Sequence, residues 1–172
     1  MQQNQTTEQF RILTVSLSSR GFGYAVMEEN TLVDYGKKGI NKDKNAWSLD
    51  HIGKVIARNQ PNVLVLQDVN AKGTHRAPRI KALHRKVVVL AKKRKIKVVK
   101  ISGTELRRVL LGNETGTKQE MAEVLAKQFP DELASRLPPE RKLWKSEDAR
   151  MDIFEAVGLA VVFRAKTARR TH

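Results

Sequence analysis

Residues 12–26 read Ile12-Leu-Thr-Val-Ser-Leu-Ser-Ser-Arg-Gly-Phe-Gly-Tyr-Ala-Val26, two largely apolar runs separated by a short polar stretch. The polar stretch, Ser18-Ser19-Arg20-Gly21, has the composition of a tight turn. Together they predict a β-hairpin with strands over 10–17 and 21–28. A further run over 31–39 extends the hairpin, so we expect the chain to begin as an antiparallel meander.

The rest of the chain alternates between helical and extended patterns. Val63-Leu-Val-Leu66 is a continuous apolar run, which is typical of a strand buried on both faces. The expected order is helix 47–59, strand 63–66, a helix from Pro78, strand 96–101, helix 104–111, helix 117–129 and a last helix with Ser146 as its N-cap. We therefore expect one α/β domain over 10–163, between a flexible N-terminus (1–9) and a basic flexible tail (164–172).

Composition limits the class of protein. The 172 residues are 40% hydrophobic, which is enough for one buried core, and they include no cysteine, which excludes a disulfide framework and a thiolate zinc site. The first residues carry neither the basic nor the apolar region of a signal peptide, and no apolar run reaches the length of a membrane span. We expect a soluble, cytoplasmic protein without a membrane partner.

Positive charge is concentrated in residues 71–100, a segment without acidic residues in a chain of net charge +15. Behind Pro78, apolar residues keep a helical period and leave Arg79, Lys86 and Lys93 facing water. A solvated helix face would explain a charge run, but solubility favours mixed signs, whereas a polyanionic backbone selects one sign. Membrane binding is less favoured because the segment has no Trp or Phe. We predict that nucleic acid is the partner of this segment, whose twelve cations are Lys72, Arg76, Arg79, Lys81, Arg85, Lys86, Lys92, Lys93, Arg94, Lys95, Lys97 and Lys100.

Asp148, Asp152 and Glu155 fall at i, i+4 and i+7, so a helix through them would carry three carboxylates on one stripe. Like charges at this spacing destabilise a helix unless a cation lies against them. A divalent metal ion is one candidate for that cation, but Asp152 and Glu155 could instead pair with Arg150, with Arg141 or with a cation from another element. The residues alone leave both alternatives open.

The order of the expected elements resembles the ribonuclease H-like fold. Residues 12–26 resemble the first hairpin of RuvC-type Holliday-junction resolvases, and Val63-Leu-Val-Leu-Gln-Asp-Val69 is similar to the fourth strand of that family. Lys118, six residues after Gly112, matches the spacing of a functional lysine, and Asp152-Ile-Phe-Glu155-Ala-Val-Gly-Leu-Ala160 resembles the last helix. The resemblance implies a five-stranded mixed sheet, three antiparallel strands and then two parallel ones, flanked by helices.

Resemblance to this family implies a Mg²⁺- or Mn²⁺-dependent endonuclease of DNA recombination, acting as a homodimer on branched DNA or structured nucleic acid, with DNA favoured over RNA. The family takes carboxylates from the first strand, the fourth strand and the last helix, but Ser16 and Gln67 occupy the first two positions here. The predicted catalytic residues are Asp68, Asp152, Glu155 and Lys118, the predicted metal ligands are Asp68, Asp152, Glu155, Asp148 and Ser16, and the predicted nucleic-acid-binding residues are Arg20, Lys72, Arg76, Arg79, Lys86, Lys93 and Lys118.

Neutral residues at two carboxylate positions leave a second hypothesis open, in which the protein is a catalytically inactive nucleic-acid-binding module. Asp68 either reaches the site or closes an Asx turn at the end of its strand. The aromatic residue that follows the fourth strand in the family has no clear counterpart, because Val69-Asn70-Ala71 comes next. Trp47 and Trp144 are expected to pack in the core or at its edge.

Overall fold

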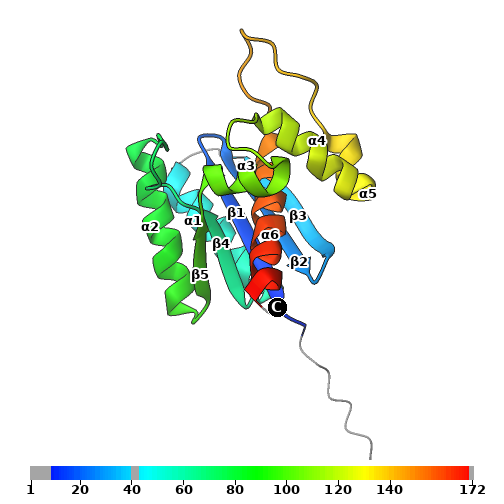
Figure 1. The fold of residues 1–172 in the computed structure, drawn as a ribbon. Coiled ribbons are helices and arrows are strands. Elements are labelled where there is room, and N and C mark those ends of the chain that lie inside the picture. The colour runs from blue at the N-terminus through cyan, green and yellow to red at the C-terminus, as the bar shows by residue number, and fades with distance from the viewer. Residues whose placement is uncertain (1–8, 40–42, 171–172) are drawn as a thin grey trace, which may run out of the picture.

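A mixed five-stranded sheet runs through the centre of the computed structural model, which describes residues 9–39 and 43–170 (Figure 1). Its strands are β1 (Arg11–Ser18), β2 (Gly21–Glu28), β3 (Thr31–Gly39), β4 (Val63–Gln67) and β5 (Lys97–Ile101). They lie in the order β3-β2-β1-β4-β5, with antiparallel pairing among the first three strands of the chain and parallel pairing of β1 with β4 and of β4 with β5. This topology confirms the ribonuclease H-like fold class expected from the sequence.

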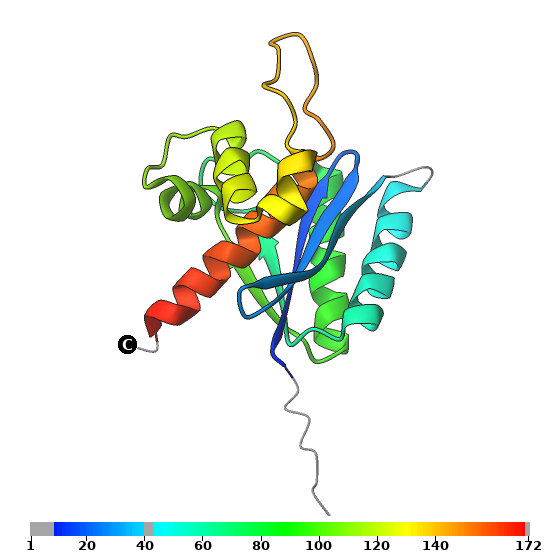
Figure 2. The ribbon, with the colours of Figure 1, turned by 90° about the vertical axis from the view of Figure 1, so that its right-hand side faces the viewer.

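Helices cover both faces of this sheet (Figure 2). One face packs against α1 (Lys44–Asn59) and α2 (Pro78–Lys93). The opposite face packs against α3 (Gly103–Leu111), α4 (Lys118–Gln128) and α6 (Met151–Arg170), and the short helices α5 (Pro130–Leu133) and η1 (Ala134–Arg136) follow α4. The molecule therefore has three layers, with α2 and α6 on opposite sides of the sheet.

Small residues let α6 lie close against β1 and β2. A Cβ at Gly23 of β2 would lie 2.0 Å from the Asp152 carbonyl oxygen, so a larger residue would push the helix away. Ala156 and Ala160, one turn apart on α6, are fully buried, and the Thr14 hydroxyl donates a hydrogen bond to the Ala156 carbonyl at 2.5 Å. This close approach brings the first turn of α6 over the end of β1.

Local signals predicted several helix ends correctly. The Thr117 hydroxyl caps α4 by accepting a hydrogen bond from the Glu120 amide at 3.1 Å. Gly112 ends α3 in the left-handed conformation, with φ of 76°. Pro78 lies in the first turn of α2, as expected. Within residues 9–39 and 43–170, no helix combines the length and apolar character needed to cross a membrane.

The last helix, α6, differs from its expected bounds at both ends. It begins at Met151 rather than just after Ser146, because Asp148 forms a turn in which its carboxylate accepts the Arg150 amide at 2.9 Å. It continues to Arg170, so residues 164–170 are helical rather than a flexible tail. Residues 171–172 and all but Gln9 of the expected flexible N-terminus lie outside the described residues.

Candidate functional site

Two serines of β1 meet two carboxylates of α6 at the carboxyl end of β1. Ser16 and Ser18 are two residues apart and therefore point to the same face of the strand. The Ser16 hydroxyl donates to Glu155 Oε2 at 2.7 Å, and the Ser18 hydroxyl donates to Asp152 Oδ2 at 2.8 Å. Asp152 and Glu155, three residues apart on α6, face the strand together. The structure thus brings together residues that are more than 130 positions apart in the sequence.

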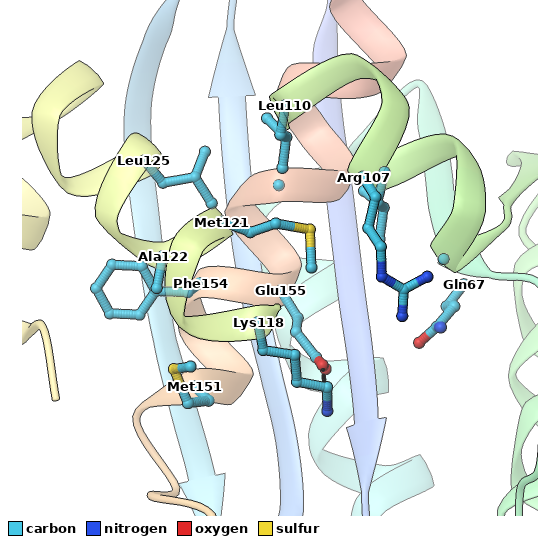
Figure 3. A pocket seen from close by; sticks show the side chains of 13 residues that line it. Gln67, Arg107, Leu110, Lys118, Met121, Ala122, Leu125, Met151, Phe154 and Glu155 are labelled. Carbon is cyan, nitrogen blue, oxygen red and sulfur yellow. Dashed lines mark ion pairs between the residues drawn. The ribbon is translucent and has the colours of Figure 1, made fainter. Parts of the chain in front are cut away.

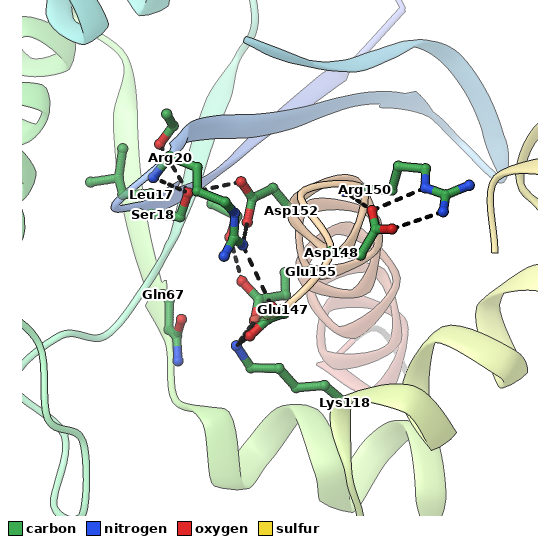
Figure 4. A network of polar contacts seen from close by, with 12 residues as sticks. Leu17, Ser18, Arg20, Gln67, Lys118, Glu147, Asp148, Arg150, Asp152 and Glu155 are labelled. Carbon is green, nitrogen blue, oxygen red and sulfur yellow. Dashed lines mark hydrogen bonds and ion pairs between the residues drawn. The ribbon is translucent and has the colours of Figure 1, made fainter. Parts of the chain in front are cut away.

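Each of these carboxylates also binds a cation of the same chain (Figure 4). Arg20, in the turn after β1, places Nη2 at 2.9 Å from Asp152 Oδ1. Lys118, at the start of α4, places Nζ at 2.8 Å from Glu155 Oε1. In each carboxylate, therefore, one oxygen accepts from a serine hydroxyl and the other accepts from a cationic group.

Glu147, in the loop before α6, links the Arg20–Asp152 and Lys118–Glu155 ion pairs. Its carboxylate lies 3.2 Å from Lys118 Nζ and 3.7 Å from Arg20 Nη2. Three carboxylates and two cations thus form one connected network, and the Arg76 guanidinium adds a further positive charge close enough to affect Glu155. Three carboxylates against two cations leave one net negative charge, which the nearby Arg76 guanidinium offsets, so the site has little net attraction for an added cation.

Burial and ion pairing set the protonation of these groups. Burial raises the pKa of Asp152 above its ordinary value, although Ser18 and Arg20 partly offset the effect. Burial also raises the pKa of Glu155, but the Lys118 ammonium and the Ser16 hydroxyl lower it by more, to below its ordinary value. Burial opposes the charge of Lys118, yet Glu155 and Glu147 keep the pKa of the ammonium above its ordinary value.

An apolar pocket between α3, α4 and α6 lies directly beside the ion pair of Lys118 with Glu155 (Figure 3). Figure 3 shows Lys118 and Glu155 at one side of this pocket and Arg107 with Gln67 at another. Most of its wall is hydrophobic, contributed by Leu106, Leu110, Met121, Leu125, Met151 and Phe154. Because these groups exclude water, the attraction between Lys118 and Glu155 is stronger than it would be on an open surface.

The side chains of Gln67 and Asp68, at the end of β4, form hydrogen bonds outside the network of Asp152 and Glu155. The Gln67 side-chain oxygen accepts a hydrogen bond from Arg76 Nη2 at 2.5 Å. Asp68 Oδ1 accepts from the Asn70 amide at 3.0 Å, which is the Asx turn considered as its structural alternative. Within the part of the chain that the structure describes, no group of three acidic or histidine side chains could hold a metal ion. Asp68 therefore does not join Asp152 and Glu155 in a ligand set.

Asp148 is the second predicted ligand that lies apart from the site. It precedes α6, so the expected helical stripe of three carboxylates is wrong and only Asp152 and Glu155 share the helix. Its carboxylate forms a bidentate pair with Arg150, at 3.0 Å to Nε and 2.8 Å to Nη2. These bonds lower the pKa of Asp148 to about 2. Arg150 therefore pairs with Asp148 and not with Asp152 or Glu155, whose counterions come from other elements, the third alternative to metal that the sequence left open.

The cations of residues 71–100 lack acidic partners among the residues that the structure describes. None of the twelve makes an ion pair with any residue in the described ranges. Lys86 and Lys93 are exposed, as expected, and so is Lys72. Arg79 differs from the expectation because it is half-buried and donates to Asn45 Oδ1 at 3.0 Å. Arg76 also points inward, to Gln67 and to the Leu17 carbonyl.

Sequence reasoning missed Ser18 and Glu147 as members of the network and misjudged one tryptophan. The signal for Ser18 was its spacing of two from Ser16, whereas Glu147 had none, because its role depends on how the loop before α6 returns to the sheet. Trp47 packs at the edge of the core, stacked on His51 at a ring distance of 3.8 Å, as predicted. Trp144 was predicted to pack in the same way, but it is 78% exposed.

Comparison with known proteins supports the fold and leaves the family open. No protein-family model matches the sequence, and no curated protein matches it. Among solved structures, Thermus thermophilus RuvC is similar with a TM-score of 0.67 and 12% identity, over 92% of this chain and 97% of that one. The yeast mitochondrial Holliday junction resolvase Ydc2 has a TM-score of 0.65 and 14% identity, over 95% of this chain and 81% of that one. Fowlpox virus resolvase, solved with Holliday junction DNA, has a TM-score of 0.59 and 16% identity, over 90% of this chain and 99% of that one. The chain thus has the ribonuclease H-like fold of these resolvases.

Proposed function

We propose that this protein binds nucleic acid, and branched DNA in particular, through a ribonuclease H-like domain whose catalytic position is closed by internal ion pairs. The observation that carries the proposal is the pairing of Asp152 with Arg20 and of Glu155 with Lys118. These pairs use the carboxylates that the resolvase resemblance assigns to metal binding.

The residues present do not fit a pair of Mg²⁺ or Mn²⁺ ions. Two such ions, about 4 Å apart, need several carboxylate oxygens to balance their charge. The first-strand position holds the hydroxyl of Ser16, and the fourth-strand position holds the amide of Gln67, both of which are neutral. The two remaining carboxylates are already neutralised by Arg20 and Lys118. We therefore derive no phosphodiester hydrolysis from this site.

The basic segment supports nucleic-acid binding. Its cations are free of acidic partners in the described ranges, so phosphate groups would not have to displace an internal counterion. Within the segment, Arg76 lies beside the site, and the exposed cations of α2 extend from Arg85 to Lys93. Two structures with the same fold, Thermus thermophilus RuvC and fowlpox virus resolvase, were solved with Holliday junction DNA, which favours branched DNA as the ligand.

A metal-dependent endonuclease is the second candidate, and one observation favours it. Arg20 and Lys118 are both partly exposed, with side-chain exposures of 32% and 43%. Backbone phosphates could therefore attract these cations away from Asp152 and Glu155, which would free two carboxylates on one helix face. In this candidate the DNA itself would open the site, with Lys118 contacting phosphate.

The two candidates are separated by one set of assays on the purified protein. Labelled four-way junction, linear duplex and structured RNA are incubated with the protein in Mg²⁺, in Mn²⁺ or in chelator, beside an Asp152→Asn variant. We expect tight, salt-sensitive binding that is strongest for the junction, with no cleavage under any condition. Metal-dependent cutting that the variant loses would establish the endonuclease instead. Sedimentation of the free and bound protein would test the homodimer that the family resemblance implies.

A further inference from the structure

The segment between η1 and α6, residues 137–150, projects from the body of the protein as an extended loop (Figures 1 and 2). Both ends of the loop are attached beside the site. The Gln119 side-chain amide donates to the Pro138 carbonyl at 3.2 Å, and the Lys118 ammonium donates to the Glu147 carboxylate at 3.2 Å. The loop therefore rises from the same edge of the sheet as the Arg20 and Lys118 ion pairs.

Two large apolar side chains occupy the centre of a β-turn in this loop. The Lys145 amide donates to the Lys142 carbonyl at 3.0 Å, so residues 142–145 form the turn and Leu143 and Trp144 are its central residues. Leu143 is 96% exposed and Trp144 is 78% exposed. Glycine, proline and small polar residues dominate such positions when the turn serves only as a connection. Adjacent exposed Leu and Trp side chains instead indicate a surface that a partner covers.

Cations surround the two apolar side chains. Lys142 and Lys145 form the corners of the turn, Arg141 precedes it, and no acidic residue lies between Glu140 and Glu147. Lys142 Nζ lies 5.5 Å from the centre of the Trp144 ring, which keeps positive charge beside the aromatic face. An aromatic face between cations matches the chemistry of an unstacked nucleobase with its flanking phosphates.

We propose that the Lys142–Lys145 turn is a base-recognition tip, in which an unpaired or unstacked base of the bound nucleic acid stacks on Trp144. This inference rests on the proposed function and adds the class of substrate. The base faces of an uninterrupted duplex are covered by neighbouring pairs, so the tip would select single strands, bulges and branch points. The loop's attachment beside Arg20 and Lys118 favours nucleic acid over a lipid surface, which Leu and Trp between lysines would also suit.

The test measures binding of Trp144→Ala and Trp144→Phe to three labelled DNAs: a single strand, a four-way junction and an uninterrupted duplex. We expect Trp144→Ala to weaken binding to the single strand and the junction by about tenfold or more, because base stacking on an aromatic side chain contributes this much. Duplex affinity should change by less than about twofold, since phosphate contacts dominate there. Trp144→Phe, which keeps an aromatic face, should retain most of the affinity.

A Trp47→Phe variant is the matched control for binding. It also allows Trp144 fluorescence to be measured alone. Trp47 is part of α1, on the face of the sheet opposite α6, where it packs against Phe22 and His51, so its replacement should leave the affinities unchanged. Trp144 is then the single tryptophan of the chain, and its fluorescence should be quenched by the single strand and the junction.

Each other outcome overturns the proposal in a distinguishable way. Equal losses on all three DNAs, or unchanged Trp144 emission on a junction that binds, would refute the tip while leaving nucleic-acid binding intact. Quenching by vesicles of acidic phospholipid but by none of the DNAs would assign the turn to a membrane surface. Absence of binding by the unmodified protein to any of the DNAs would refute both this inference and the proposed function.

Discussion

Cations at the edge of the sheet beneath α6 and cations on the outer face of α2 differ in whether an acidic residue lies against them. At the edge, Arg20 and Lys118 lie against Asp152, Glu155 and Glu147, and these acids of the same protein neutralise their charge. On α2, the exposed cations Arg85, Lys86, Lys92 and Lys93 face water without an acidic partner in the described ranges. Which cations can bind a polyanion therefore depends on where the acidic residues lie. The net charge of +15 does not by itself say which cations are free.

Removing charge from α2 should have the largest effect on nucleic-acid binding. Replacement of Arg85, Lys86 and Lys93 by Gln removes three exposed cations that make no ion pair within residues 9–39 and 43–170. If each contacts a phosphate, the plot of log K against log salt becomes shallower by about 2.7, and affinity at ~0.1 M salt falls by at least roughly 100-fold. Fluorescence polarisation with labelled duplex across a salt series measures both quantities.

The matched control removes the same charge from paired positions. Lys54, Arg108 and Lys166 each lie against an acid, at Asp50, Glu114 and Glu105 respectively. Their replacement by Gln should change the salt slope little, because these cations are already neutralised. Equal losses in the two triple variants would mean that net charge alone governs binding, and the contrast between the two regions would disappear.

Breaking an ion pair at the edge should instead cost stability. Arg20→Met leaves the buried Asp152 with the Ser18 hydroxyl but without its guanidinium, and should lower the free energy of unfolding by about 2–4 kcal/mol. Arg150→Met breaks the more exposed pair with Asp148 and should cost clearly less stability, because exposed ion pairs are weakened by solvent. Urea denaturation compares the two variants. Equal costs would show that the Arg20 pair is an ordinary surface contact.

Much of the fold could be predicted because its signals are local. The hairpin, the continuous apolar run of β4, the cap at Thr117 and the glycine after α3 each depend on a few neighbouring residues. The expectation failed at Asp148, where a bond to the Arg150 amide competes with continuation of the helix. Such competition between a side chain and the helix backbone leaves little trace in hydrophobic periodicity.

The site was predicted less completely because its partners come from four separate elements. Ser16, Asp152, Glu155 and Lys118 do converge, and the resolvase pattern had pointed to each. Their pairing with Arg20 and one another could not be predicted, since it depends on how closely α6 approaches β1 and where the turn after β1 directs its arginine. Asp68 illustrates the limit: the sequence offered a site and a turn equally, and the hydrogen bond to Asn70 decides for the turn.

Neutralising Glu155 should have a smaller effect that depends on pH. Its pKa is lowered in the folded protein, so its ionised form stabilises the fold above the ordinary value of 4.5, and this contribution is lost as pH falls through the lowered pKa. Glu155→Gln should therefore lower the free energy of unfolding by about 1–2 kcal/mol at neutral pH and by progressively less in acid. Urea denaturation at neutral pH and near pH 3 measures the difference.

An exposed glutamate of α4, Glu123, supplies the control for this pH effect. Its side chain makes a single contact of 3.5 Å with Gln119 among the described residues, so Glu123→Gln should change stability little at either pH. A Glu155→Gln effect that stays constant between neutral and acidic pH would show that the carboxylate contributes shape rather than charge.

Addition of a divalent metal ion should have the smallest effect of all, which is measured as the shift in Tm of the unmodified protein. Because Arg20 and Lys118 already neutralise the two carboxylates, millimolar MgCl₂ or MnCl₂ should shift Tm by less than about 1 °C relative to NaCl of the same ionic strength. The Ser16→Asp, Gln67→Glu double variant restores acid at both neutral positions and should gain about 3 °C or more from Mn²⁺. Comparable shifts in both proteins would mean that a metal ion displaces Arg20 and Lys118 unaided. The edge beneath α6 would then be a metal site held shut by weak internal pairs, and the endonuclease would become the better account of the same residues.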